Sequence, residues 1–297
     1  MPDTLRLAIT ADLHLGIRKS GDEATRLLTD FLRADPPDLL VLAGDQGAGD
    51  EFAACLKLFQ DLPCQKALVP GNHDIWVEEN DPRGDSLRVY RESLPSVSAA
   101  CGVHYLDSAP LFVAEAGLAI VGSINWYDYS WSLEKLQKLL PDWQERLYSK
   151  RFTRGRHNDA RFIRWPLDDR AFTAQVVATL ERHLQQAVEK VDDVIVITHH
   201  PPFHGLSFPR PGPETIDGLL WDAFSGNRSV EKLLQRFESH IRLAFCGHTH
   251  RERENALGPI RGVNIGGDYH FKRLVTLAWP SGRTEVHVFG DPAARAE

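Results

Sequence analysis

Five short clusters of polar side chains, each directly after an apolar run, contain the candidate metal-binding and catalytic residues of this sequence. They offer carboxylates, imidazoles and an amide oxygen, which suit manganese, iron or zinc in a site open to water and substrate. One cluster alone is as typical of a turn as of a site, because Gly, Asn and Asp are favoured in turns. Five of them, all after apolar runs, favour a metal site. The clusters are Asp12-Leu13-His14, Gly44-Asp45, Gly71-Asn72-His73-Asp74, His199-His200 and Gly247-His248-Thr249-His250.

The spacing within the clusters is compatible with a site for two ions. Asp12 and His14 are two residues apart, so strand periodicity places both side chains on one face, where they can bind one ion. A pair of ions about 3.5 to 4 Å apart needs a bridging carboxylate, and Asp45, alone at the end of its predicted strand, is the natural candidate. Neighbours on a strand point to opposite faces, so only one of His199 and His200 is expected to reach a metal.

The apolar runs before the clusters are typical of buried strands, and stretches with helical periodicity lie between them. Alternating strands and helices predict an α/β fold with the clusters beyond the carboxyl ends of parallel strands. The alternating tail predicts a second, largely antiparallel sheet that closes a sandwich. The predicted strands are 5–10, 38–43, 66–69, 103–106, 111–114, 118–121, 194–198, 241–245, 263–265, 274–278 and 284–288. The predicted helices are 22–33, 52–59, 171–191 and 230–237.

Composition and charge narrow the classes of function. The formal net charge of -7 over 297 residues argues against a nucleic-acid surface that covers the whole protein. The four cysteines have no paired spacing, so neither a disulfide framework nor a thiolate zinc site is expected. The N-terminus lacks the features of a signal peptide, and no apolar run approaches the roughly 20 residues that span a bilayer. These features predict a cytoplasmic protein without a membrane span.

The five clusters, in this order, resemble the motifs of the calcineurin-like metallophosphoesterase superfamily, in a match that spans nearly the whole chain apart from one insertion. With the pattern of strands and helices, the resemblance implies one domain over residues 1–297 with an α/β fold. The expected architecture is a four-layer α/β/β/α sandwich of two mixed sheets flanked by helices, with a helical or irregular insertion. The resemblance also implies a metal-dependent phosphoric ester hydrolase with two divalent ions per chain, manganese first and iron or zinc as alternatives.

Carried over by position, the resemblance implies two sets of metal ligands with Asp45 as the bridge between the ions. His199 is preferred to His200 because it aligns with the family's motif. The two sets are Asp12, His14 and His250 for one ion and Asn72, His199 and His248 for the other.

The resemblance likewise implies the reaction. A hydroxide that bridges the two ions would attack phosphorus in line, and the metals would neutralise the developing charge. His73 would stabilise or protonate the leaving oxygen, with Asp74 as its partner.

Residues 125–169 form the predicted insertion, which is rich in aromatic and basic side chains. Its expected role is a lid or a substrate-binding cap. The alternative is a nucleic-acid surface, because Arg and Lys bind backbone phosphates and aromatic rings stack on bases. The candidate substrate contacts are Trp126, Tyr127, Tyr129, Arg151, Arg154 and His204.

The leading hypothesis is hydrolysis of a phosphate ester of small or moderate size. The alternative is a nuclease acting on DNA or RNA, because the Asp-Leu-His-Leu-Gly form of the first motif is similar to that of repair exonucleases in the same superfamily. The family's protein serine/threonine phosphatases carry an arginine shortly after the bridging aspartate, where this chain has Gln46-Gly47-Ala48-Gly49, so a phosphoprotein substrate is disfavoured. A non-catalytic scaffold is a third hypothesis, which the complete ligand set argues against.

Overall fold

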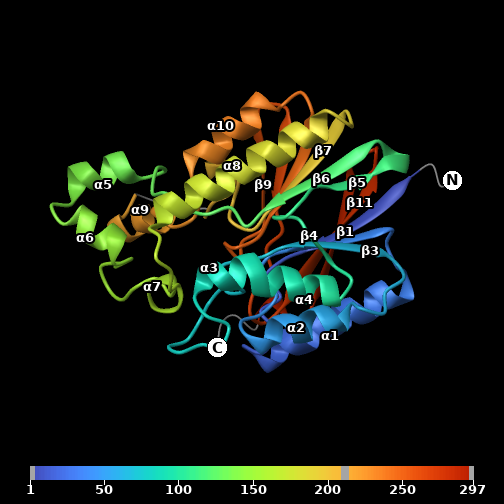
Figure 1. The fold of residues 1–297 in the computed structure, drawn as a ribbon, viewed down its shortest axis with the longest axis horizontal. Coiled ribbons are helices and arrows are strands. Elements are labelled where there is room, and N and C mark those ends of the chain that lie inside the picture. Colours follow the sequence, from blue (N-terminus) through green and yellow to red (C-terminus); the bar gives the residue numbers. More distant parts are fainter. Residues whose placement is uncertain (1–3, 209–213, 294–297) are drawn as a thin grey trace.

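The computed structural model of the protein describes residues 4–208 and 214–293, and both ends of the predicted 1–297 domain lie outside these ranges. Within them, two six-stranded sheets pack face to face with helices on their outer faces (Figure 1). Each sheet contains parallel and antiparallel pairs, so the predicted α/β/β/α sandwich of two mixed sheets is confirmed. In the described part of the chain, no helix is long and apolar enough to cross a membrane.

The first sheet has the order β12-β11-β1-β2-β3-β4, in which β1 to β4 run parallel and β11 is antiparallel to β1. Helices cover its outer face (Figure 1). The strands are β1 (Leu5–Thr10), β2 (Leu39–Ala43), β3 (Gln65–Val69), β4 (His104–Tyr105), β11 (Lys272–Trp279) and β12 (Arg283–Phe289). The helices are α1 (Lys19–Ala34), α2 (Asp50–Leu58), α3 (Ser86–Arg88), the π-helix Val89–Ser93 and α4 (Leu94–Ala100).

The second sheet has the order β5-β6-β7-β8-β10-β9, in which β6, β7, β8 and β10 run parallel. Two helices, α8 (Asp169–Val188) and α10 (Arg228–Arg236), cover its outer face (Figure 1). The strands are β5 (Leu111–Val113), β6 (Leu118–Ser123), β7 (Asp193–Thr198), β8 (Ile241–Cys246), β9 (Arg253–Leu257) and β10 (Ile260–Asn264). Short 3₁₀ turns are formed by Ala114–Ala116 and His204–Leu206.

Strand periodicity divides the buried strands between separate cores. In β1, Leu7 and Ile9 belong to the core between the sheets, whereas Ala8 packs with the helices of the first sheet. In β7, Ile195 belongs to the central core and Val194 to the core beneath α8 and α10. Each fully buried Leu, Ile or Val side chain stabilises the fold by about 1.5–3 kcal/mol. The loops at the strand ends are therefore attached to a rigid double sheet.

Each predicted strand and helix has a counterpart in the structure, but the pairing expected for the tail was wrong. The tail does not form a sheet of its own. β10 pairs in parallel with β8 in the second sheet, whereas β11 and β12 extend the first sheet beside β1. Alternation identifies a strand with one buried face, but it carries no information on the partner strand. The helices between residues 86 and 100 and α9 (Ile216–Ala223) were not predicted.

The insertion, residues 125–169, extends from one end of the sandwich (Figure 1). It is partly helical and partly irregular, as expected, and α5 packs beside α9. It begins after β6 and ends at the start of α8, so both of its ends leave the layers of the second sheet. Its helices are α5 (Leu133–Leu139), α6 (Trp143–Tyr148) and α7 (Asp159–Phe162).

Candidate dinuclear metal centre

The polar clusters predicted from the sequence follow the carboxyl ends of β1, β2, β3, β7 and β8. The first three strands belong to one sheet and the last two to the other. Parallel strands present their carboxyl ends at the same edge of a sheet, where ligands bind in α/β folds. The structure brings residues of all five clusters together at one end of the sandwich.

Several of these residues adopt the left-handed backbone conformation, which is uncommon for residues other than glycine. The φ angle is 56° at Asp12, 45° at His14, 58° at Asp45, 71° at His248 and 54° at His250. Each residue in such a conformation costs on the order of 1 kcal/mol, and strain of this kind clusters at functional sites. The chain thus leaves these strands through sharp turns, which lets side chains from several strands converge.

Two glycines in the motifs allow a ligand from another strand to approach the backbone. A Cβ atom on Gly44 would lie 2.1 Å from His199 Nδ1, and a Cβ atom on Gly71 would lie 2.1 Å from Asp45 Oδ1. Real Cβ atoms do not approach other atoms so closely, so no larger residue fits without a shift of these ligands. The loops of the two sheets therefore interlock at the site.

The carboxylate and imidazole atoms form two groups that meet at Asp45. Asp45 Oδ2 lies 3.5 Å from His14 Nε2, and Asp45 Oδ1 lies 3.4 Å from His199 Nε2. One carboxylate oxygen thus faces each group, which is the arrangement needed to bridge two ions. Within each group, one ligand atom of every residue lies within 4.8 Å of the others; the groups are Asp12, His14, Asp45 and His250, and His199, His200 and His248.

Asn72 joins the second group through its amide oxygen. Asn72 Oδ1 lies 3.0 Å from His199 Nε2 and 3.3 Å from His248 Nδ1. His200 also lies in this group, so both neighbouring histidines approach it. β7 ends at Thr198, so the alternation of side chains along a strand does not extend to His199 and His200.

The electrostatics of the site fit a divalent cation. Asp12 is fully buried, yet its Oδ2 has no hydrogen-bond partner among the described residues. Burial, together with the charge of Asp45, raises the pKa of Asp12 to about 7. Burial, together with His73, lowers the pKa of His14 well below its usual value, so the imidazole is neutral, which is the form that binds metals. A bound cation would compensate the buried carboxylates and occupy these free lone pairs.

His73 lies beside the two groups of candidate ligands, but it belongs to neither group as these are formed by the described residues. Its side chain is almost buried and lines the cavity above the site, with Nε2 3.9 Å from Asp45 Oδ2. The ring stacks on Trp76 with 3.5 Å between ring centroids. A group in this position can act on a substrate held at the centre without being a metal ligand.

Asp74 is not the hydrogen-bond partner of His73 that the resemblance implied. Its carboxylate instead accepts hydrogen bonds from three backbone amides, those of Asp45 at 3.0 Å, Gly47 at 2.9 Å and Gly71 at 2.7 Å. Burial, together with the charge of Asp45, raises the pKa of Asp74 to about 8. Asp74 therefore holds the loops after β2 and β3 in register, and it makes no hydrogen bond with the His73 ring, whose Nδ1 has no partner among the described residues.

A cavity of about 470 Å³ lies over the two groups. Its walls combine aromatic rings with two guanidinium groups of the insertion, so an anionic and partly apolar molecule would be complementary to it. In addition to metal-centre residues, it is lined by Trp76, Phe152, Arg154, Gly155, Arg156, His157, Asn158, Phe208, Trp221 and Tyr269.

Among the predicted substrate contacts, Arg154 lines this cavity, and the structure places the others outside it. Trp126 and Tyr127 are fully buried in the hydrophobic core, because the chain continues inside the protein after β6 before it enters the exposed part of the insertion. Arg151 forms ion pairs with carboxylates of its own segment. His204 lies 3.4 Å from a carboxylate of α9, outside the cavity.

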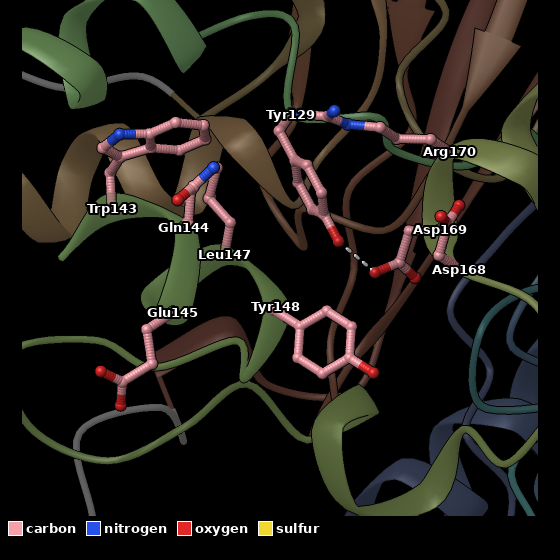
Figure 2. Close-up of a pocket in the computed structure, with 9 residues that line it drawn as sticks. All are labelled: Tyr129, Trp143, Gln144, Glu145, Leu147, Tyr148, Asp168, Asp169 and Arg170. Carbon is pink, nitrogen blue, oxygen red and sulfur yellow. Dashed lines mark hydrogen bonds between the residues drawn. The ribbon is translucent and has the colours of Figure 1, made fainter.

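Tyr129 lines a different cavity, of about 450 Å³, beside α6 and the start of α8. Figure 2 shows its hydroxyl pointing at Asp169, to which it donates a hydrogen bond. Asp169 also accepts a hydrogen bond from Trp126 Nε1 at 2.9 Å and pairs with Lys150 Nζ at 2.6 Å. Trp126 and Tyr129 therefore connect the start of the insertion to α8, and the buried rings of Trp126 and Tyr127 lie edge-on to His200.

The structure adds Asp159, His157 and Trp76 to the residues around the centre. Trp76 follows the third motif by two residues, so its position in the sequence could have suggested it. Asp159 begins α7 and His157 lies just before it, in a stretch whose arginines are its most distinctive feature in the sequence. No motif or periodicity marks them, because they reach the centre through tertiary contacts alone.

Comparison with known proteins agrees with this geometry. The sequence model of the calcineurin-like phosphoesterase family matches residues 5–252. The phosphopantetheinyl hydrolase PptH from Mycobacterium tuberculosis is similar in structure, with a TM-score of 0.64 and 20% identity over 89% of each chain. TT1561 from Thermus thermophilus has a TM-score of 0.55 at 12% identity, and a dimetal phosphatase from Danio rerio has 0.54 at 14% identity; each match covers 96% of this chain and 98% of the other.

At these identities the structural likeness shows a shared fold. None of the curated proteins matches the sequence. The family match extends over most of the chain and includes all five polar clusters. The chain belongs to the calcineurin-like phosphoesterase family and is a metal-dependent hydrolase of phosphate esters.

Proposed function

We propose that this protein hydrolyses a phosphate ester of small or moderate size at two divalent ions, with Mn²⁺ as the first choice and iron or zinc as alternatives. The position of Asp45 carries this proposal, because its two oxygens face two separate groups of imidazoles at 3.5 and 3.4 Å. When bound, the ions would supply Lewis-acid activation of water and neutralise charge on the phosphoryl group.

The geometry supports the same distribution of ligands that the family resemblance implies. Asp12, His14 and His250 would hold one ion, Asp45 would bridge, and Asn72, His199 and His248 would hold the other. His200 is a further candidate for the second ion, since its buried Nε2 has no hydrogen-bond partner among the described residues.

We assign His73 to the leaving group. Its ring lines the cavity, and Trp76 fixes its plane by stacking. From this position it would stabilise or protonate the leaving oxygen, so that the alcohol departs without a full negative charge. Asp74 contributes indirectly, because it holds the loop from which His73 projects.

The cavity walls support a substrate that combines a phosphate ester with an apolar or flat group. Trp76, Trp221 and Tyr269 offer aromatic surface, and Arg154 and Arg156 offer charge-assisted hydrogen bonds to an anion. The names of two structural relatives, a phosphopantetheinyl hydrolase and a dimetal phosphatase, are compatible with such a substrate.

A nuclease remains the alternative, and Arg154 and Arg156 are the observation that favours it. Both are exposed at the cavity and could contact a nucleic-acid backbone. The net charge of -7 opposes long-range attraction of a polyanion, and the aromatic residues once considered for base stacking, Trp126 and Tyr127, are buried. We therefore favour the smaller substrate.

Assays of the manganese-loaded protein on phosphomonoesters, phosphodiesters, nucleotides and single-stranded DNA test this choice. We expect turnover of small esters, and the double variant Arg154→Gln/Arg156→Gln should raise KM several-fold. Arg151→Gln is the matched control, because Arg151 lies outside the cavity. Cleavage confined to DNA would overturn the proposal, especially if the double variant lowered the log-log salt slope of DNA binding by roughly 0.7 to 0.9 for each phosphate that the protein no longer neutralises.

A further inference from the structure

The structure assigns a positioning role to Asp159 of the insertion: it holds the Asn72 amide so that the oxygen, and not the nitrogen, faces the second metal ion. This inference rests on the proposed function. It gives the insertion a part in the metal centre that is separate from any contact with substrate.

Asp159 is almost completely buried, and three side-chain donors converge on its carboxylate. Its Oδ1 accepts hydrogen bonds from Asn72 Nδ2 at 2.9 Å and from Trp76 Nε1 at 2.8 Å. Its Oδ2 accepts one from the hydroxyl of Tyr127 at 2.8 Å. Both oxygens therefore act as acceptors, and only the nitrogen side of the Asn72 amide can bond to this carboxylate.

The orientation matters because the two ends of an amide differ in what they can do. Asn72 Oδ1 has lone pairs and lies 3.0 Å from His199 Nε2, within the second ligand group. A flipped amide would turn N–H groups toward the ion and set its oxygen against Asp159. Residues behind metal ligands fix ligand orientation in this way, and their loss typically lowers metal affinity 10- to 100-fold.

The same carboxylate also reaches the proposed leaving-group residue. Trp76 donates its indole N–H to Asp159 and stacks its ring on His73. The insertion is joined to this loop by a backbone hydrogen bond as well, from Val77 N to Phe162 O at 2.9 Å. Asp159 thus contacts the residues that support both the second ion and His73.

Calorimetric titration of the metal-stripped protein with Mn²⁺ tests the inference without an activity assay. In Asp159→Ala, one of the two ions should bind 10- to 100-fold more weakly, while the other is unaffected. Asp159→Asn keeps one acceptor oxygen and should restore part of the affinity. Asp169→Ala is the matched control: it also removes a buried carboxylate of this region that holds aromatic donors, but it contacts no proposed ligand.

Unchanged binding of both ions by Asp159→Ala would overturn the inference, as would an equal loss in Asp169→Ala, since the effect would then come from general packing. If Asp159→Ala does not fold, Tyr127→Phe replaces it, because it removes one hydrogen-bond donor to Asp159. The affinity for the same ion should then fall to a smaller extent. Unchanged affinities for both ions in Tyr127→Phe and Asp159→Asn would also reject the assignment. Fewer than two ions in the parent protein would instead reject the proposed function itself.

Discussion

Two buried carboxylates near the metal centre are held in opposite ways. Asp74, in the loop after β3, accepts hydrogen bonds from three backbone amides of the strand-end loops. Asp159, in the insertion, accepts hydrogen bonds from three side chains, those of Asn72, Trp76 and Tyr127. Asp74 thus connects the strand-end loops through their backbone, whereas Asp159 connects the insertion to them through side chains, beside the backbone hydrogen bond from Val77 N to Phe162 O.

This difference determines which substitutions each region tolerates. A backbone amide is present whatever the residue, so the network around Asp74 depends mainly on loop length and on glycines such as Gly71. The network around Asp159 requires an amide, an indole and a phenol at fixed places. Substitutions can therefore separate the two regions, and four predictions follow this distinction from the largest expected effect to the smallest.

Loss of the bridge should abolish the strand-end site. Asp45→Asn removes one charge between the two ligand groups, so Mn²⁺ content should fall below about one ion per chain. Turnover should fall by more than the roughly 10²–10³-fold loss caused by removing one transition-state hydrogen bond. Metal analysis and steady-state kinetics measure both effects. Two retained ions per chain would reject Asp45 as the bridge.

Loss of His73 should leave the metals in place. His73→Ala should lower turnover of alkyl phosphate esters by about 10²–10⁴-fold, because their leaving oxygens need a proton. Aryl esters with good leaving groups should lose much less. Equal losses on both substrate types would contradict the assignment, and unchanged metal content is the control.

Loss of Asp169 should affect the insertion and not the metal centre. Asp169→Ala leaves Lys150 buried without its partner and also deprives Trp126 and Tyr129 of their acceptor. Removing one member of a buried ion pair typically lowers the free energy of unfolding by about 3–5 kcal/mol. Chemical denaturation measures this. Lys150→Met should lower the free energy of unfolding by less, because Asp169 keeps its two aromatic hydrogen-bond donors. A larger loss in Lys150→Met than in Asp169→Ala would count against this account.

Asp107 lies between the two cases, because it accepts hydrogen bonds from one backbone amide, of Ile124, and one side chain, of Tyr90. Burial raises the pKa of its carboxyl to about 6. In the folded protein it thus keeps its proton at pH values where the unfolded chain, with a pKa of about 3.9, has lost it. Its contribution to stability is complete below about pH 4 and is lost as the pH rises through about 6.

Asp107→Asn should remove this pH dependence. Between about pH 4 and pH 6, the parent should lose about 1–3 kcal/mol of unfolding free energy relative to the variant. Chemical denaturation of the metal-stripped parent and variant across this pH range measures the difference in their unfolding free energies. Titrating groups that the two proteins share cancel in that difference. Parallel pH curves for the parent and the variant would refute the assignment.

The sandwich and the clustering of the ligand residues were predictable from the sequence for a physical reason. The periodicity of apolar residues indicates which face of a strand or helix is buried. A polar cluster directly after an apolar strand indicates residues that lie at the edge of the sheet where the strands end. Asp12, Asp45 and His248 come from three separate strands, yet each is marked by its own strand end. Local signals were sufficient because these residues depend on local geometry.

The remainder depended on contacts that have no local signal. β11 pairs with β1 from the opposite end of the chain, and nothing in its alternation indicates this partner. Trp126 and Tyr127 looked like substrate contacts because aromatic residues near a cleft often bind ligands, but their rings complete the core. The hydrogen bond between Asn72 and Asp159 joins residues from two distant segments, and nothing in the local sequence of either residue indicates the other.

The attachment of Asp159 to the strand-end loops has a consequence for protein engineering. A cap that contacted only the substrate could be exchanged for another without effect on the metal ligands. In this protein, a graft that replaced residues 125–169 would retain the proposed ligands that lie outside the segment but leave the buried Asn72 amide and the Trp76 indole without their acceptor. A successful chimaera would have to carry over the carboxylate of Asp159 together with the new cap.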